Sequence, residues 1–275
     1  MQPVQTRRTF LGLTGSALTG SFLAPAAPAP SPWQIGCYTR PWDKHDYRVA
    51  LDAIAEAGYQ YVGIMTAQGK RWVMITVDTT PEEAAAIGAS VKERGLKTIS
   101  VYGSGIPART SIEAGIAGLR TLIDHTVACG APNLLLGGPK KELSKAYYKI
   151  VAECCGYAAD QGVGLSVKPH GGANATAAEC RRIIESVNHP SFRMWYDPGN
   201  IFYYSGGKLD PVDDAPDAKG LVAGMSVKDF LPPKNVLVTP GTGKVRFPEV
   251  MKKLRDGGFT GGPLVVECLA QGDIA

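Results

Sequence analysis

The feature that most limits the possible folds of this chain is a regular alternation of short apolar segments with longer amphipathic ones. Apolar strand-like segments occur at 35–38, 61–65, 97–102, 133–136, 164–168, 192–196, 223–227 and 263–267. Helical patterns run through Leu51 to Gly58 and over 81–94, 111–128, 142–160, 176–187 and 247–256, whereas 197–222 is predicted as a short irregular crossover. Glycine follows most of these helical patterns, which is a typical stop signal. Strands that alternate with helices in this way pair in parallel.

Eight such units within residues 33–275 predict an α/β fold, a (β/α)₈ TIM barrel, which typically needs about 250 residues. An open doubly wound sheet is the alternative, but it usually carries a glycine-rich phosphate loop after its first strand. Residues 38–42 contain no such loop. The sequence ends eight residues after Glu267, so the last outer helix is not expected. Either the sequence is truncated or a partner, such as a second copy, covers that face.

The N-terminal segment, residues 1–32, is predicted to lie outside the barrel. Arg7 and Arg8 precede a weakly apolar stretch and an Ala/Pro segment, an order typical of a twin-arginine export signal. Cleavage is expected after Ala26, and the mature chain is then periplasmic or secreted. An ordinary disordered tail is the alternative interpretation. No later apolar run reaches the roughly 20 residues that a membrane span requires.

Charge and cysteine content exclude two further classes. The net charge of +4 comes from lysines and arginines spread along the chain, so nucleic acid is not an expected partner. The six cysteines form no C-x-x-C pair and have no metal-ligand spacing. We expect most of them to be small buried hydrophobes.

Charged and polar residues end four consecutive strands of the predicted barrel. In such a barrel the C-terminal strand ends form the mouth, where active sites lie, and side-chain alternation decides which residues face the axis. This predicts one shared pocket for Lys168, His170, Asp197, Lys228 and Glu267. Each of these residues alone is better explained as a surface charge. Together they are not, because a charge at the end of a buried strand must be paired or used.

Candidate substrate-binding residues lie close to the same strand ends. Tyr38 and Trp42 follow the first strand, and Asn200 follows Asp197. Further aromatic residues near the predicted rim are Trp195, Phe202, Tyr203 and Tyr204, although Trp195 is equally well explained as barrel filling. Such aromatic side chains stack on sugar rings.

Five motifs in the last 110 or so residues resemble the xylose isomerase-like sugar isomerase/epimerase barrel family. They are KPHGG at 168–172, YDPGN at 196–200, SVKD at 226–229, PGTGKVRFPEV at 240–250 and VVEC at 265–268. The resemblance implies a small-molecule sugar or polyol substrate. It also implies a divalent metal (Mn, Fe, Zn or Mg), held by a Glu, an Asp, a His and a final Glu, whose two glutamates move a proton beside a carbonyl.

This sequence departs from the family pattern at two of the four ligand positions. Lys168 stands where the family has the first Glu, and Ser226 where it has the ligand His, whereas Asp197 and Glu267 are retained. A lysine ammonium beside a dication is repelled strongly. Two arrangements remain open: His170 joins Asp197 and Glu267 as a metal ligand, or Lys168 replaces the metal as the cation that polarises the substrate.

The expected function is an exported sugar isomerase or epimerase that transfers a proton next to a carbonyl. Glu267 is the candidate base, with Lys168 and His170 as electrophile and acid and Lys228 beside them. Crowding by Lys228 and loss of solvent also permit a base role for Lys168. Two alternatives remain: a non-catalytic carbohydrate-binding relative that has lost the metal site, and a lyase that eliminates from a keto sugar.

Overall fold

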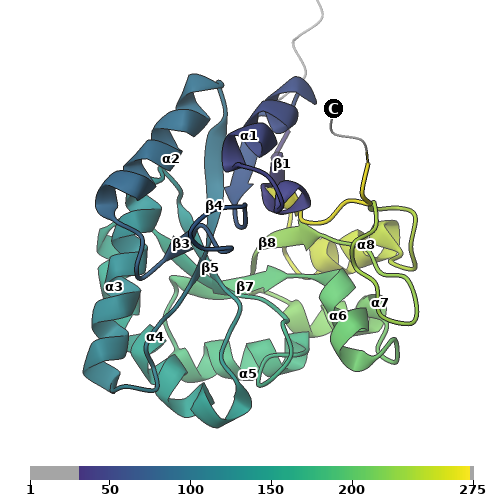
Figure 1. The fold of residues 1–275 in the computed structure, drawn as a ribbon. Helices are drawn as coiled ribbons and strands as arrows, with labels where there is room; N and C mark the ends of the chain where they lie inside the picture. The colour runs from purple at the N-terminus through teal and green to yellow at the C-terminus, as the bar shows by residue number, and fades with distance from the viewer. Residues whose placement is uncertain (1–30, 273–275) are drawn as a thin grey trace, which may run out of the picture. The chain divides into compact units, whose positions relative to one another are not determined.

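Parallel strands close into a barrel that helices surround on the outside (Figure 1). The computed structural model describes residues 31–272. The strands are β1 (Trp33–Tyr38), β2 (Tyr61–Ile64), β3 (Ile75–Thr76), β4 (Lys97–Ser104), β5 (Asn133–Leu136), β6 (Gly164–Val167), β7 (Phe192–Tyr196), β8 (Val222–Val227) and β9 (Gly262–Val266). The pairing of β2 with β4 closes the ring, and β1 pairs with β9 on its other side. This confirms the (β/α)₈ prediction; the two-residue β3, which flanks β4, was not expected.

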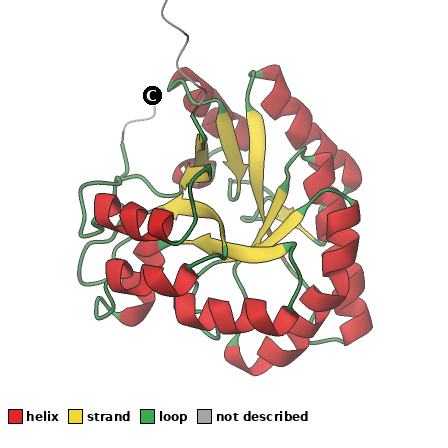
Figure 2. Cartoon of the chain, turned by 180° about the vertical axis from the view of Figure 1, so that it is seen from behind, coloured by secondary structure: helices red, strands yellow, loops and turns green. Residues whose placement is uncertain are grey.

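The helices follow the strands in the order that the alternating pattern predicts, and they lie around the outside of the barrel (Figure 2). They are α1 (Tyr47–Glu56), α2 (Pro81–Glu93), α3 (Ile112–Ala128), α4 (Ser144–Asp160), α5 (Ala177–Val187), α6 (Pro198–Ser205), α7 (Pro211–Asp214) and α8 (Phe247–Asp256), with short 3₁₀ turns at Arg40–Trp42, Lys141–Leu143 and Ala215–Ala218. Within the described residues no helix follows β9. None of the described helices is long and apolar enough to cross a membrane.

The segment between β7 and β8 differs from the predicted irregular crossover, because it contains α6 and α7. The Pro198-Gly199 pair suggests a turn, but Asp197 caps these residues as the first turn of a helix. The Asp197 carboxylate accepts the backbone N–H of Asn200, and proline occupies the first helical position, where its missing N–H costs nothing. These residues therefore begin a helix at the strand end.

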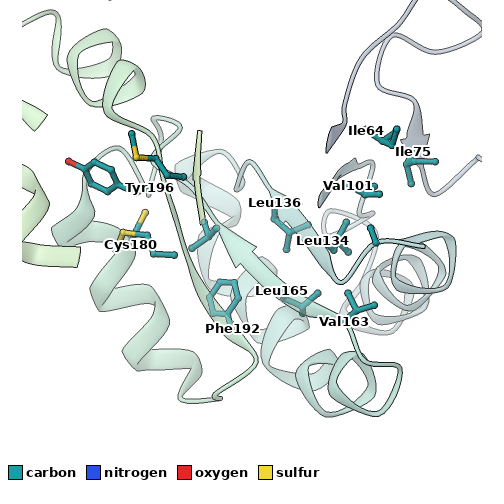
Figure 3. Close-up of a cluster of buried hydrophobic side chains, with 14 of the residues drawn as sticks. Ile64, Ile75, Val101, Leu134, Leu136, Val163, Leu165, Cys180, Phe192 and Tyr196 are labelled. Atoms are coloured by element: carbon teal, nitrogen blue, oxygen red, sulfur yellow. The ribbon is translucent and has the colours of Figure 1, made fainter. Parts of the chain in front are cut away.

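Outward-facing strand residues form the main hydrophobic core against the helices (Figure 3). Leu134, Leu165 and Phe192 are at most 1% exposed and belong to this layer. All six cysteines are buried free thiols, as predicted. At 25 cal/mol per Å² or so of buried apolar surface, this layer supplies the main favourable term that holds the helices on the barrel.

Two large aromatic side chains fill the inside of the barrel below its mouth. Tyr38 and Trp195 are both 0% exposed, and their ring centroids are 6.5 Å apart. Glycines make the space, because a Cβ at Gly63 or Gly224 would overlap the ring of Tyr38 or Trp195. The expected rim position of Tyr38 is therefore wrong: its hydroxyl donates to Ser100 Oγ at 3.1 Å inside the barrel.

A buried carboxyl, Asp214, ties α7 to the start of α5 and to β7. Its Oδ1 accepts the N–H of Ala177 at 3.1 Å, and its Oδ2 lies 3.2 Å from the Tyr196 hydroxyl. The same hydroxyl lies 2.8 Å from the Pro211 carbonyl oxygen, so its single O–H is shared between these two acceptors. Burial raises the pKa of Asp214 to about 6, while the hydrogen bonds from Ala177 and Tyr196 oppose this rise.

We predict that Asp214→Asn removes a pH-dependent loss of stability. Because the folded-state pKa lies above the unfolded one, the unmodified chain is most stable below pH 4 or so and loses stability as the pH rises to about 6. The loss is about 3 kcal/mol. Thermal melting from pH 4 to 7 should show this slope in the unmodified chain and not in Asp214→Asn. Asp213→Asn, at the exposed neighbouring position, should keep the slope; equal slopes in all three would contradict the assignment.

Candidate active site at the barrel mouth

Four neighbouring strands each deliver one charged side chain to the same end of the barrel. Lys168, Asp197, Lys228 and Glu267 directly follow the last residues of β6, β7, β8 and β9. Because the strands are parallel, these positions meet at one end. All four side chains are at most 2% exposed. The structure thus brings together four of the five residues that strand alternation placed in one pocket, and the fifth, His170, lies beside them.

Glu267 is the centre of this cluster. Its Oε1 accepts hydrogen bonds from Lys168 Nζ at 2.9 Å and Arg40 at 3.2 Å, and it lies 2.6 Å from Lys228 Nζ. Its Oε2 accepts from Lys168 Nζ at 2.8 Å and from Ser226 Oγ at 2.6 Å. A carboxylate offers about four lone-pair positions. Every one of them is engaged.

Asp197 holds the other side of the two lysines. Its Oδ2 lies 3.0 Å from Lys228 Nζ and 3.4 Å from Lys168 Nζ, and its Oδ1 accepts the N–H of Asn200. Lys228 also donates to Asn200 Oδ1 at 3.1 Å, while the Asn200 amide donates to the Pro169 carbonyl. Asn200, predicted to bind substrate, therefore positions Lys228 in this structure.

The environments of the charged groups push their pKa values in different directions. Burial lowers the pKa of Lys168, and the neighbouring Lys228 adds to this effect, while Glu267 opposes it. For Lys228 the attraction of Asp197 and Glu267 outweighs burial, so its pKa is raised. Burial alone would raise the pKa of Glu267, but the cations Lys168, Lys228 and Arg40 hold it well below its usual range. Glu267 is thus a firmly ionised carboxylate.

His170 lies nearby as a neutral imidazole. Burial, reinforced by Lys168 and Lys228, lowers the pKa of His170 to about 3. Its ring packs against Tyr204, with centroids 5.4 Å apart. A positively charged acid form is therefore unfavourable here, although a neutral imidazole can still donate or accept a hydrogen bond.

Two residues of the site were missed in the sequence analysis, Arg40 and Tyr102. Arg40 begins the 3₁₀ turn that follows β1, so strand alternation does not give the direction of its side chain. The Tyr102 ring lies 5.6 Å from Lys168 Nζ. A Cβ on Gly137 would come within 3.4 Å of both the Tyr102 hydroxyl and His170 Nδ1, so these two side chains border the same backbone. Trp42, the third predicted substrate-binding residue, packs instead against the outer core.

Comparison with known families is consistent with this geometry. The sequence profile of the xylose isomerase-like TIM barrel family matches residues 51–274, most of the chain. The chain belongs to this family. Among curated proteins, no significant match to the sequence was found.

Solved structures show the same fold at low sequence identity. A xylose isomerase domain protein from Planctomyces limnophilus superposes with a TM-score of 0.64 at 19% identity, covering 86% of this chain and 88% of that one. A D-psicose 3-epimerase, solved in the presence of D-fructose, superposes with a TM-score of 0.66 at 14% identity, covering 87% of this chain and 86% of that one. A D-allulose 3-epimerase from Methylomonas sp., in complex with D-allulose, superposes with a TM-score of 0.66 at 18% identity, covering 87% of this chain and 85% of that one.

The donor set of this member of the xylose isomerase-like family does not fit a divalent metal. Lys168 Nζ occupies the space between Glu267 and Asp197, and the Ser226 hydroxyl donates a hydrogen bond to Glu267. Neither carboxylate leaves an oxygen without a partner. Within residues 31–272 no three His, Cys, Asp or Glu side chains are grouped so as to hold a metal ion. The proposed ligand set of His170, Asp197 and Glu267 is therefore not assembled, because lysine ammonium groups already neutralise the carboxylates.

We predict that Lys168→Glu creates a metal site. The substitution restores a carboxylate at the family's usual position and removes the ammonium that occupies the space. Mn²⁺ should raise the melting temperature of Lys168→Glu by several degrees, and EDTA should reverse the rise. Lys168→Gln, which removes the charge without adding a ligand, should respond weakly. A stoichiometric divalent metal in the unmodified chain, detected by elemental analysis, would contradict this account.

Proposed function

We propose that this chain is a sugar isomerase or epimerase-like enzyme that transfers a proton next to a carbonyl without a divalent metal. The fold and the position of the cluster at the C-terminal mouth support this proposal, because TIM barrel enzymes place their catalytic residues there. The structural neighbours named as 3-epimerases supply the substrate class, a ketose or a related sugar derivative.

The observation that carries the proposal is the position of Lys168 Nζ between Glu267 and Asp197. A cation is thus fixed where the family pattern implies a metal. Lys228 and Arg40 add two further positive groups on the same Glu267 oxygen. Fixed charges in a site with little water stabilise the negative charge that develops on a carbonyl oxygen when the neighbouring carbon loses its proton.

Either Glu267 or Lys168 accepts the proton that the substrate carbon loses. Glu267 has the correct form, an ionised carboxylate, but Lys168 covers both of its oxygens. Lys168 is a base only in its uncharged form, and the lowering of its pKa favours that form. Any shift of Lys168 toward substrate uncovers Glu267, so both residues are required. Tyr102, His170 and Tyr204 border this pair and offer aromatic faces and hydrogen-bonding groups to a sugar.

A carbohydrate-binding protein without catalytic activity is the second candidate. It is favoured by one observation: every carboxylate oxygen of the cluster already has a partner and the four strand-end side chains are buried. A binder would show ligand-dependent thermal shifts without conversion of the sugar. Analysis of the products also separates an epimerase from a lyase, because elimination from a keto sugar releases water.

We predict that Glu267→Gln lowers turnover of the responsive ketose by about 10²–10⁴-fold, the usual cost of losing a general base. A panel of ketoses assayed by chromatography identifies that substrate, and EDTA should leave the rate unchanged. Glu249→Gln, an exposed change on α8, serves as the control.

Because removal of a buried counter-ion also lowers stability, Glu267→Asp is the second variant. The aspartate keeps the negative charge, but its side chain is one methylene shorter and holds the carboxylate farther from the substrate. Turnover should therefore fall while the folded state is retained. Unchanged turnover in both variants would remove Glu267 from the mechanism and favour the binding protein.

Export belongs to the same proposal, although the residues that carry it lie outside the described part of the chain. Arg7 and Arg8 form the twin-arginine pair, and cleavage after Ala26 would release a mature periplasmic or secreted barrel.

We predict that replacing Arg7 and Arg8 by lysines abolishes export of the barrel. The positive charge is conserved, so a general electrostatic effect is excluded and only receptor recognition is lost. Cell fractionation with an antibody to the barrel measures the outcome. Lys44→Arg in the barrel should not affect export, and efficient export of the double variant would contradict the signal.

A further inference from the structure

The charges of the buried cluster do not balance when every group is ionised. Among the described residues, Lys168, Lys228 and Arg40 provide three cations, and Asp197 and Glu267 provide two anions. The Arg40 side chain is 22% exposed, whereas both lysines are buried, and excess charge among buried groups is costly. All three cations, moreover, contact the single Oε1 atom of Glu267. Release of one proton makes the cluster neutral.

The hydrogen bonds indicate which proton is dispensable. Lys228 contacts three separate acceptors, on Glu267, Asp197 and Asn200. An uncharged Lys228 amine would have only two N–H groups for these three acceptors. Lys168 contacts only the two carboxylates.

Both carboxylates remain satisfied when Lys168 is uncharged. Glu267 keeps Lys228, Arg40 and Ser226. Asp197 keeps Lys228 and the N–H of Asn200. Lys168 is therefore the member of the cluster that can lose a proton at least cost, and the lowering of its pKa by burial agrees with this.

We propose that Lys168 is a carbonyl-reactive amine that forms an imine with the ketone group of a keto sugar. This inference rests on the proposed function for its substrate class and adds a covalent step to it. Buried lysines next to a second cation are known to act as such nucleophiles, because their uncharged form is populated near neutral pH. Lys168 Nζ lies over the Tyr102 ring, 5.6 Å from its centroid, so one side of the amine faces an aromatic ring.

The step is a condensation and needs no oxidant or reductant. The Lys168 nitrogen forms a bond to the carbonyl carbon and gives up two hydrogens. The carbonyl oxygen receives both hydrogens and leaves as water. A proton from solvent then converts the imine to an iminium ion, which withdraws electrons from the adjacent carbon and makes its hydrogen acidic, as a metal-bound carbonyl would.

Imine formation also changes the role of Glu267. In the free protein Lys168 covers both of its oxygens, at 2.9 and 2.8 Å. An imine nitrogen carries at most one hydrogen, so at least one of these contacts is released. The freed oxygen then lies beside the covalently held sugar and can accept the acidic proton. Lys228 and Arg40 keep Glu267 ionised throughout.

Reductive trapping tests the proposal directly. The full chain is incubated at pH 7 with dihydroxyacetone or D-fructose and sodium cyanoborohydride, and its peptides are mapped by mass spectrometry. The expected product is a peptide containing Lys168 whose mass has increased by one ketose less one oxygen atom. Its labelling rate should exceed that of exposed lysines, such as Lys70 with an 82% exposed side chain, by at least tenfold.

Two matched variants locate the reactive amine. Lys168→Arg keeps the positive charge but cannot form an imine, so the rapid labelling should disappear. Lys228→Arg removes the other buried lysine, and labelling of Lys168 should persist. If either variant fails to fold, the peptide map of the unmodified chain still decides the question.

The outcomes separate this inference from the proposed function. Failure of both ketones to label Lys168 overturns the imine, and turnover that remains sensitive to Glu267→Gln would then leave the proposed function intact with Lys168 as a fixed cation. Labelling of Lys168 without turnover of any ketose supports the imine and contradicts the isomerase or epimerase. Labelling confined to exposed lysines also overturns the imine.

Discussion

The shared carboxylate of Glu267 is the interaction on which the site depends. Two lysines, an arginine and a serine contact it where almost no water reaches. Charges of this kind are costly to bury singly and become tolerable only as a complete set. Consequently, β6, β7, β8 and β9 and the turn after β1 must all keep their register for the cluster to exist. Below the cluster, the barrel interior is filled by Tyr38 and Trp195 together with aliphatic side chains such as Leu135 and Val265.

A site with lysines in place of a metal lies at the same place in the barrel but offers different chemistry. A divalent metal ion is positively charged at any pH, whereas a lysine is positively charged only while its amine is protonated. Under the proposed function, the mouth of this barrel couples electrostatic stabilisation to proton transfer within one cluster. The pKa of Lys168 is lowered and that of Lys228 is raised, and the proposal assigns the two tasks to these two lysines accordingly. Pairs of like groups with divergent pKa values are typical of acid–base sites.

Much of the fold and part of the site were predictable from sequence. Strand positions were recovered nearly to the residue, because buried parallel strands are continuous apolar runs between glycine-terminated helices. Alternation then placed Lys168, Asp197, Lys228 and Glu267 on the inner face. The same rule does not reach Arg40, which lies in the 3₁₀ turn after β1 and not on the strand. Tyr38 obeyed the rule as well, but alternation gives the direction of a side chain and not its depth along the barrel axis.

The sequence by itself determined the eight-fold alternation, the barrel and the direction of the strand-end charges, because these follow from local periodicity. Only the tertiary structure decided how the charges pair. Glu267 and Lys168 are separated by 99 positions in the chain, and no local pattern specifies that their side chains meet at 2.8 Å. Whether Lys168 repels a metal or takes its place, and whether Glu267 is free or fully engaged, depends on distances across the barrel. Those distances are set by closure of the sheet and by the packing beneath it.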